Sequence, residues 1–412
     1  MTGFPIAPLV EGKTGFGLYV FANPALASEA DLEEFKRLLF IHSVLVFRHE
    51  TLTGGSFTPK QQLDLTAAFG SAPTGIYGHG AGKKQEKSIL HPDLVTLPTV
   101  PQVQLIGNGL VTEPHHGVPP GTRLNHPHHR TFHRTRVSDE DDVKGVTRFY
   151  RWHIDAALYA LYPPIVTTLH AIKLPPPSTQ LLRYDDGSND ELNVSIGTTA
   201  FISGATAFDI LTPAQKSLVV RGYIKYAPHP YVWMGPAKSR PTGLGMESEG
   251  LELSLGENED GTGGGGGPGE VPEWSEDKVM VFPMVWKNPV TRKLHLQIHP
   301  SAIHSIIIDP LPQSPTPFPI DTLYPTGAKI TDLKEARDLV YSLQRAGIAP
   351  DLVYAHDWQE GDVCLFHNRG VLHSVVGAFP KETVRMFHQC NLAGSEAPAG
   401  PEDADLELFC HY

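Results

Sequence analysis

Hydrophobic and polar residues alternate with a helical period in four segments, and each segment carries residues typical of helix ends. Segment 28–48 joins an acidic first turn to apolar positions and then to the β-branched run SVLVF, which predicts a helix followed by a strand. Shorter helices are predicted over 58–70, 212–222 and 331–347. The residues expected to open or close these helices are Ser28, Thr58 with Pro59 and Gly70, Thr212 with Pro213, and Thr331 with Gly347.

Between these helices lie short apolar runs rich in β-branched residues, which predict strands. They are PQVQLIG, IVTTLHAIKL, QLLRY, KVMVFPMVW, KLHLQIH and VCLFH. A few helices around a strand-rich core predict an α+β protein built on a β-sandwich or barrel. Because no break divides the chain into self-sufficient halves, residues 1–412 are expected to form a single domain. Two insertions are predicted: the His- and Pro-rich stretch 111–145 and the Gly-rich stretch 255–273, the latter as a flexible loop.

Composition narrows the class of protein. The formal net charge of -12 argues against a nucleic-acid partner, since proteins that bind phosphate backbones carry basic patches. The chain has no run of about 18 apolar residues, and its first residues, MTGFPIAPLV, lack the basic start and apolar stretch of a signal peptide. Its three cysteines form no disulfide pattern. These features predict a soluble cytoplasmic protein without a membrane partner.

The run RFYRWHIDAALYALYPP places two metal-capable side chains, His153 and Asp155, in an otherwise apolar segment. If residues 149–155 are extended, both point to one face and Ile154 to the other. That pattern is typical of a half-buried strand with a polar face, but it also supplies part of a metal site. With the distant His373, it completes the two-histidine, one-carboxylate triad that binds iron and leaves three adjacent positions open. The same ligands suit zinc, so a zinc hydrolase is an alternative.

A second strand-like run, RMFHQCN, follows His373 and carries a cation. The residues that share one of its faces are Arg385, Phe387, Gln389 and Asn391. A 2-oxo acid that chelates iron and bears a second carboxylate needs a cation at its far end, which the planar fork of Arg385 matches. The alternative is an ordinary barrel strand. Inward polar side chains are costly to bury without partners, which favours the pocket, with Cys390 packed behind it.

These motifs resemble those of the taurine and 2,4-dichlorophenoxyacetate dioxygenase superfamily of iron- and 2-oxoglutarate-dependent enzymes. The runs RFYRWHIDAALY, YDDGS, YAPHPY, SRPTGLG, HPHHRTFHR and LFHNRGVLHSVVGAF are similar to those of its fungal xanthine dioxygenases. The resemblance implies a double-stranded β-helix (a jelly roll) with flanking helices, Fe²⁺ as the metal, and 2-oxoglutarate and dioxygen as cosubstrates. The implied iron ligands are His153, Asp155 and His373. The implied reaction converts xanthine to uric acid and releases succinate and carbon dioxide.

The resemblance also implies roles for residues around the cosubstrate and the purine. Arg385 would hold the distal carboxylate of 2-oxoglutarate together with Thr179, whose alternative reading is a loop hydroxyl. In the xanthine dioxygenases, residues implicated around the purine match four positions of this chain: Gln102, Asp142, Gln389 and Asn391. Amides suit a heterocycle edged with carbonyl and N–H groups, because each amide both donates and accepts hydrogen bonds. Asp142 lies in an acidic run that is equally typical of a solvated loop.

One departure from the family concerns substrate choice. The family run Leu-Lys-His-Pro-His-His reads LNHPHH here, so Asn125 replaces a lysine thought to contact substrate or cosubstrate. Loss of that charge should weaken an anion contact. Another purine or heterocycle is therefore an alternative substrate, and a catalytically silent binding protein is an alternative function. The sequence is also compatible with a homo-oligomer.

Several histidines have open roles. Six lie in the predicted insertion: His115, His116, His126, His128, His129 and His133. They suggest either a second metal site or a solvated lid, and the absence of nearby cysteines favours the lid. His367 is a rival to His373 as a metal ligand, but its place beside the Asn368–Arg369 pair favours a turn residue.

Overall fold

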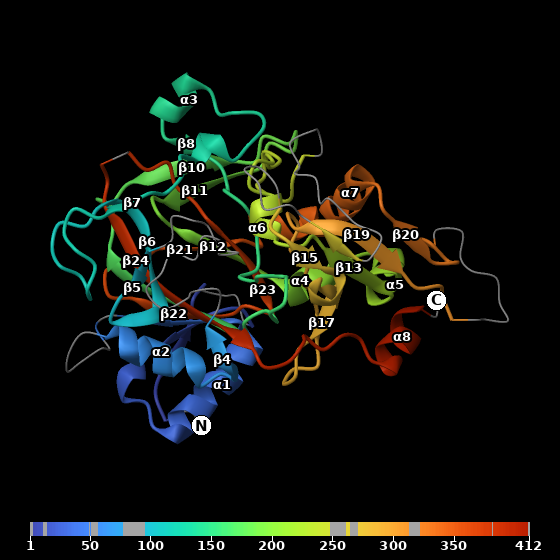
Figure 1. Cartoon of the computed structure of the whole chain (residues 1–412), viewed down its shortest axis with the longest axis horizontal. Coiled ribbons are helices and arrows are strands. Elements are labelled where there is room, and N and C mark those ends of the chain that lie inside the picture. Colours follow the sequence, from blue (N-terminus) through green and yellow to red (C-terminus); the bar gives the residue numbers. More distant parts are fainter. Residues whose placement is uncertain are drawn as a thin grey trace.

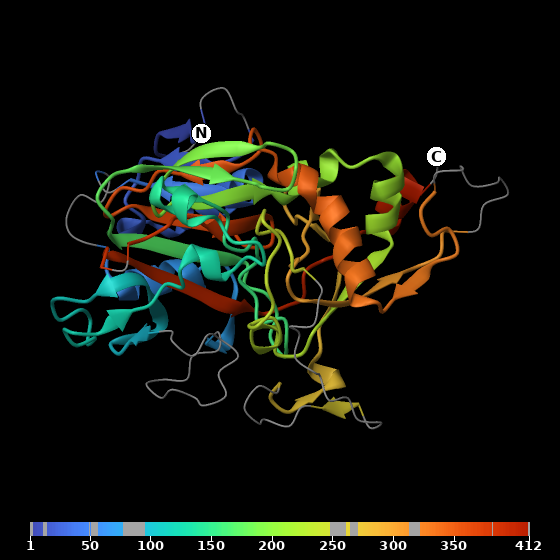
Figure 2. The same ribbon diagram turned by 90° about the horizontal axis from the view of Figure 1, so that it is seen from above.

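Figure 1 shows two regions side by side, one dominated by strands and one in which a smaller sheet is flanked by helices. Figure 2 shows the same two regions from above. The structure is a computed structural model, and it describes residues 3–10, 15–48, 50, 57–76, 95–247, 261–263, 271–312, 322–380 and 382–410. In these ranges, no helix is both long and apolar enough to cross a membrane.

A ten-stranded sheet forms the backbone of the first region. Its main path runs β1 (Ile6–Pro8), β2 (Leu18–Val20), β3 (Val44–Phe47), β22 (Val363–His367), β9 (Val166–Lys173), β24 (Arg385–Gly394), β6 (Val100–Leu110) and β5 (Val95–Leu97). Two further strands leave this path: β4 (Ser71–Ile76) pairs with β24, and β7 (Arg123–Leu124) pairs with β6. β24 therefore lies near the centre of the sheet, between β9 and β6.

Two three-stranded sheets complete this region. One consists of β21 (Tyr354–His356), β12 (Thr199–Ser203) and β23 (Val371–Val375), and the other of β11 (Glu191–Ser195), β10 (Thr179–Arg183) and β8 (Val146–Thr147). A buried cluster that includes Phe201 of β12, Phe366 of β22 and Phe387 of β24 joins the first of them to the large sheet. Sheets that share a core in this way form a sandwich, so the predicted jelly-roll core with flanking helices is confirmed.

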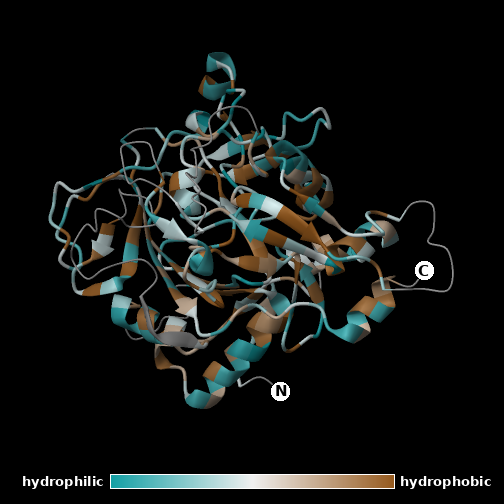
Figure 3. Ribbon diagram, turned by 45° about the vertical axis from the view of Figure 1, so that its right-hand side comes forward, coloured by the Kyte–Doolittle hydropathy of each residue, from teal (hydrophilic) through white to brown (hydrophobic). Residues whose placement is uncertain are grey.

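The second region has its own four-stranded sheet and apolar core. The strands are β16 (Val281–Pro283), β13 (Gly222–Tyr226), β19 (Ile303–Ile308) and β20 (Ala328–Ile330). The helices of this region are α4 (Gly204–Asp209), α5 (Pro213–Val220), α7 (Leu333–Gln344) and α8 (Asp403–Cys410). Shorter elements of this region are α6 (Pro230–Trp233) and the strand pairs β14 (Thr262–Gly263) with β15 (Trp274–Ser275) and β17 (Val285–Lys287) with β18 (Leu294–Leu296). The short helix α3 (Asp139–Val143) lies beside β8 in the first region. Figure 3 shows hydrophobic residues concentrated on the inner strands.

The predicted helices form, and their caps explain where they begin. In α1 (Glu29–His42) and α2 (Pro59–Ala67), the capping residues are Ser28 and Thr58, each part of a reciprocal capping box. Thr212 caps α5 in the same way. The fourth prediction was wrong in detail, because Asp332 rather than Thr331 caps α7, accepting the amide of Glu335. This helix continues past Gln344 as the 3₁₀ helix η5 (Arg345–Ile348).

The two predicted insertions differ in how they are built. Segment 111–145 contains β7, the 3₁₀ helix η3 (His129–Thr131) and α3, and it is docked rather than solvated throughout. His133 is buried in it and contacts the carbonyl of Phe149 at 2.7 Å through Nε2. In stretch 255–273, Thr262–Gly263 pairs with Trp274–Ser275, while residues 255–260 and 264–270 lie outside the described residues.

Candidate active site

The three predicted metal ligands lie together. One carboxylate oxygen of Asp155, Oδ1, is 3.6 Å from Nε2 of His153 and 3.6 Å from Nε2 of His373. The ligand atoms of the three residues all lie within 4.8 Å of one another. Asp155 and His373 are buried, whereas His153 keeps part of its surface exposed. Three donors on one side of a small space, one of them open to solvent, leave room for exchangeable ligands.

Backbone pairing brings the two histidines together across the sequence. The amide of His153 donates to the carbonyl of His373 at 3.0 Å, and the amide of His373 donates back at 3.1 Å. Residues 149–155 form only isolated bridges of this kind, at Phe149 and His153, rather than a continuous strand. The predicted alternation is nevertheless present, because Ile154 is fully buried in the core of the second region, away from the ligands.

Neighbouring groups hold each ligand in a metal-binding orientation. Nδ1 of His153 lies 2.8 Å from the carbonyl of Arg151, which fixes the tautomer and frees Nε2. The second carboxylate oxygen of Asp155, Oδ2, accepts a hydrogen bond from Thr167 at 2.8 Å and one from Gln389 at 3.1 Å. Only Oδ1 is therefore left for a metal.

The backbone of Asp155 is fixed from the tight turn HNRG. The side chain of Asn368 accepts from the amide of Asp155 at 2.9 Å and donates to its carbonyl at 2.7 Å. The side-chain Nδ2 of Asn368 also donates to the carbonyl of Pro164 at 3.1 Å. Asn368 therefore positions the aspartate that precedes it by more than two hundred residues in the chain.

Apolar walls keep the site dry on one side. The ring of His373 packs 4.7 Å from that of Phe366 and 6.1 Å from that of Phe201. Burial, reinforced by nearby His153, lowers the pKa of His373 to about 3, so the ring is neutral at physiological pH, as a metal ligand must be. Buried His299 lies beside both ligand histidines, and burial lowers its pKa to about 3 as well.

The donor set fits ferrous iron. Two imidazoles and one carboxylate on a single face are typical of non-haem iron sites with open positions, and a zinc site with one open position uses the same ligand types. The distinction comes from the rest of the pocket, where a buried cation would serve a second, charged ligand that a hydrolytic zinc site does not require.

That cation is Arg385. Its guanidinium is buried over the ring of Phe387, 3.9 Å from the ring centre, with Phe379 at 5.8 Å. Its polar contacts are to the carbonyl of Gly197, at 3.3 Å from Nε and 3.2 Å from Nη2. Burial lowers its pKa to about 10, so it stays charged at neutral pH. Among the described carboxylates none pairs with it, so the remaining N–H groups suit an anion.

Arg385 belongs to the same strand face as the metal site. Gln389, which contacts Asp155, lies four residues after Arg385 on β24 and on the same face. Phe387 lies between them on that face. Asn391 continues this face, is buried, and has an unpartnered Oδ1. On β6, Gln104 lies directly opposite Gln389 in register. Half-buried Gln102 is two residues further along that strand, so the predicted amide-bearing face forms.

Aromatic residues close the pocket around Arg385. The ring of His126 stacks on Tyr150 with centres 4.9 Å apart and meets Phe379 edge-on at 5.5 Å. Burial and the charge of Arg385 lower the pKa of His126 to about 3. The hydroxyl of Tyr150 donates to the carbonyl of Gly377. These residues form an apolar, neutral wall that leaves the charge of Arg385 uncompensated.

A cavity of about 320 Å³ opens beside this wall. It is bordered by Phe379, Gln180 and Asp142, among other residues. Asp142 thus lines this cavity, and its carboxylate is also engaged by His129 at 2.6 Å. Asn125 is exposed and directly precedes His126, so it lies at the rim of the pocket.

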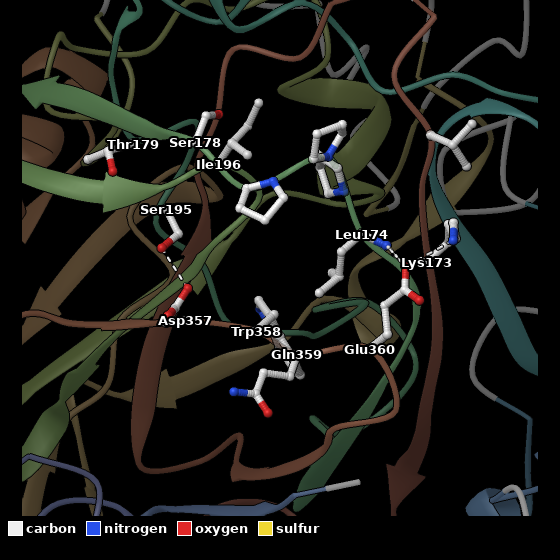
Figure 4. Close-up of a pocket in the computed structure, with 14 residues that line it drawn as sticks. Lys173, Leu174, Ser178, Thr179, Ser195, Ile196, Asp357, Trp358, Gln359 and Glu360 are labelled. Atoms are coloured by element: carbon white, nitrogen blue, oxygen red, sulfur yellow. Dashed lines mark hydrogen bonds and ion pairs between the residues drawn. The ribbon is translucent and has the colours of Figure 1, made fainter.

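Thr179 is not brought to Arg385. It is exposed and lines a separate surface groove of about 960 Å³, together with Ser178, Ser195 and Asp357 (Figure 4). The reason is strand alternation, because Thr179 begins β10 and its side chain points outward. The next residue, Gln180, is the one that faces inward, where it contacts the backbone of Ala378 at 2.9 Å and 3.1 Å.

Two other predictions concern neighbours of the ligands. His367 ends β22 and its ring lies against Phe40 and His295, outside the group formed by His153, Asp155 and His373. Cys390 is fully buried in the apolar cluster behind β24, as alternation predicted.

The sequence analysis gave no role in the iron site to several residues that shape it. They are Tyr150, His126, Phe379, Gln180, Thr167, Asn368 and His299. His299 had a signal, since His295, Gln297 and His299 alternate on one face of KLHLQIH. Thr167 and Asn368 act through contacts with a residue distant in sequence, for which the pattern gave no sign.

Comparison with known proteins agrees with this geometry. The family model described as taurine catabolism dioxygenase TauD, TfdA family matches residues 5–391. The chain is 48% identical over 410 residues to an alpha-ketoglutarate-dependent xanthine dioxygenase of Neurospora crassa, covering 98% of this chain and 89% of that protein. It is 45% identical to the Schizosaccharomyces pombe protein of the same description, covering 97% and 90%.

The fold also resembles solved structures. A taurine dioxygenase from Burkholderia xenovorans matches with a TM-score of 0.53 at 16% identity, covering 97% of this chain and 91% of that one. At this identity the likeness concerns the fold alone. The family match and the fungal relatives extend over nearly the whole sequence, and the chain belongs to the TauD, TfdA family of dioxygenases.

Proposed function

We propose that this chain is an Fe²⁺- and 2-oxoglutarate-dependent dioxygenase that oxidises xanthine to uric acid. The observation that carries the proposal is a two-histidine, one-carboxylate group that shares a strand face with a buried arginine lacking a carboxylate partner in the described structure. The relatives named xanthine dioxygenases supply the substrate. We further propose that the protein acts in the cytoplasm on a small heterocycle and binds neither nucleic acid nor a membrane.

Each side chain of the site has a separate task. His153, Asp155 and His373 would hold the metal, and Thr167 with Gln389 keeps the carboxylate of Asp155 turned so that Oδ1 faces it. Arg385 binds the distal carboxylate of 2-oxoglutarate in a setting where water is excluded by Phe387 and aromatic neighbours. Bound ferrous iron would activate dioxygen at the expense of 2-oxoglutarate, giving succinate, carbon dioxide and one oxygen atom for xanthine.

The amide-bearing face is proposed to orient the purine. Gln102 and Asn391 present donors and acceptors on the face that also carries Gln389, and Asn391 retains a buried oxygen without a partner. Asp142, at the cavity border, can accept from a ring N–H. Holding the reacting carbon at a fixed distance from the metal is the contribution that these residues make to the rate.

The decisive experiment measures both products. Metal-free protein receives Fe²⁺ and 2-oxoglutarate without oxygen, then xanthine, then air, and urate and succinate are quantified together. Equal amounts of urate and succinate are expected. Succinate without urate would retain the dioxygenase and overturn xanthine as the substrate. Neither product would overturn the proposed reaction class.

A further inference from the structure

The opposite face of β24 carries a second group of histidines. Alternation turns His388 away from Gln389 and the iron site, toward His170 on the neighbouring strand β9. From the segment predicted as a lid, His115 and His116 reach the same place. These rings meet although His115 and His388 are 273 positions apart in the chain.

The geometry of this group is close. Nε2 of His115 lies 2.7 Å from Nε2 of His388. The ring of His116 is centred 4.8 Å from that of His115 and 5.6 Å from that of His388. One nitrogen from each of the three rings lies within 4.8 Å of the others. Three imidazole nitrogens at this spacing can share one small cation.

A tight turn holds two of the rings in place. His115 and Val118 exchange backbone hydrogen bonds of 3.0 Å and 2.8 Å. The residues between them have positive φ, 47° at His116 and 90° at Gly117, as a two-residue turn of this hand requires. The carbonyl of His116 also accepts from the amide of Thr99 at 3.4 Å. The turn therefore presents both side chains to β24 from a fixed backbone.

The chemistry of the group favours a transition metal. Imidazole is a ligand preferred by Zn²⁺, Cu²⁺ and Ni²⁺, whereas Ca²⁺ and Mg²⁺ prefer oxygen ligands. His388 is 1% exposed, so its ring is buried where it meets His115 and His116. Its Nδ1 has no hydrogen-bond partner in the described structure.

We propose that His115, His116 and His388 form a second metal site, separate from the iron site, for a divalent transition metal of the Zn²⁺ class. Three imidazoles leave one tetrahedral position for water. The bound metal would tie the 115–118 turn to the strand that carries Arg385 and Gln389 on its other face. Its role is to stabilise the structure rather than to take part in oxidation.

A neighbouring histidine group is less suited to a cation. In the group of His128, His129 and Asp142, the carboxylate is already bound to His129 at 2.6 Å. The guanidinium of Arg130 lies 3.7 Å from its other oxygen, where it competes with a metal ion. The His115–His116–His388 group has no such cation among its described neighbours.

The test is a titration of metal-free, full-length protein with Co²⁺, which reports its coordination by visible absorbance. Wild-type protein is expected to bind two equivalents, one giving the weak bands of a six-coordinate ion and one the strong bands of a four-coordinate ion. Asp155→Ala should retain only the strong bands. His116→Gln should retain only the weak bands. Because His116 is exposed, its substitution should leave the fold intact, so loss of the strong bands would report loss of the second site.

Two further measurements complete the design. Zn²⁺ should raise the melting temperature of Asp155→Ala protein but not that of the Asp155→Ala, His116→Gln double variant. His128→Gln is the matched control, an exposed histidine of the neighbouring group that should leave both equivalents bound. One equivalent in wild-type protein, or strong bands that persist in His116→Gln, would overturn the second site and leave the 2.7 Å contact as an imidazole–imidazole hydrogen bond.

Discussion

The two faces of β24 carry two histidine-associated groups that differ in how they are held. On the inner face, Gln389 and Thr167 both donate to one carboxylate oxygen of Asp155, which leaves the other oxygen free for a metal. On the outer face, His388 meets two histidines from a tight turn, with no carboxylate in the group. The inner group has a charged ligand and surrounding hydrogen bonds that orient it, while the outer group relies on turn geometry.

This difference has a chemical consequence. A carboxylate with two imidazoles suits iron with several exchangeable positions, and a buried arginine nearby adds a place for a charged cosubstrate. Three imidazoles without an anion suit a divalent transition metal such as Zn²⁺. Successive residues of one strand thus serve separate purposes, because alternation sends them to opposite sides of the sheet.

The largest effect is expected from removing the carboxylate of the inner group. Asp155→Ala should abolish urate and succinate formation. Its loss of Fe²⁺ affinity should exceed the roughly 10–100-fold cost of losing an outer-shell partner. Iron content and product formation measured on the same preparation check this expectation. Retained iron-dependent succinate formation would show that another group supplies the third ligand.

The next effect separates the cosubstrate from the metal. Arg385→Gln removes a buried charge opposite a carboxylate, a change that costs about 2 kcal/mol or more and raises the KM for 2-oxoglutarate by about 30-fold or more. Iron affinity should change little. Arg385→Lys keeps the charge but loses the planar fork of the guanidinium. Its KM for 2-oxoglutarate should therefore lie between those of Arg385→Gln and the wild type.

Thr179 provides the comparison for Arg385. Since its side chain lies in the outer groove of Figure 4, Thr179→Val should leave the KM for 2-oxoglutarate unchanged. An increase comparable to that of Arg385→Gln would restore the pairing of threonine and arginine that the family resemblance implies. The steady-state dependence on 2-oxoglutarate at saturating xanthine measures both variants.

The parts of the site that the sequence predicted are those that local patterns determine. The alternation of side chains around His153 and along 385–391 is a property of extended backbone. The tight turn before His373 is indicated by the adjacent residues HNRG. Thr179 was assigned from the family resemblance rather than from alternation, and the structure places it at the first residue of β10, in the outer groove. Contacts such as that between His115 and His388 depend on the tertiary fold, which no local period encodes.

A Gln389 variant tests whether this residue orients the iron ligand Asp155 or binds the purine. If it orients Asp155, Gln389→Leu should weaken Fe²⁺ binding by about 10-fold. Thr167→Val, which removes the other hydrogen bond to the same oxygen, should have a similar effect. If Gln389 instead reads the substrate, its variant would raise the KM for xanthine while iron affinity stays constant, and the two variants would differ. Fe²⁺ titration and xanthine kinetics on both proteins distinguish these outcomes.

The smallest change that a substitution is expected to produce is at the rim of the pocket, where Asn125 stands in place of the family's lysine. Asn125→Lys adds a positive charge next to His126, close enough to attract anionic xanthine or 2-oxoglutarate. Because the residue is exposed, solvent screening limits the gain to about 1 kcal/mol, so KM should fall by at most about fivefold. Asn125→Gln, which keeps the amide, should match the wild type. A lysine variant that changes KM at low salt but not at high salt would identify the contact as electrostatic, whereas no change at either salt would place the site's substrate contacts further inside, on the amide-bearing face of β6 and β24.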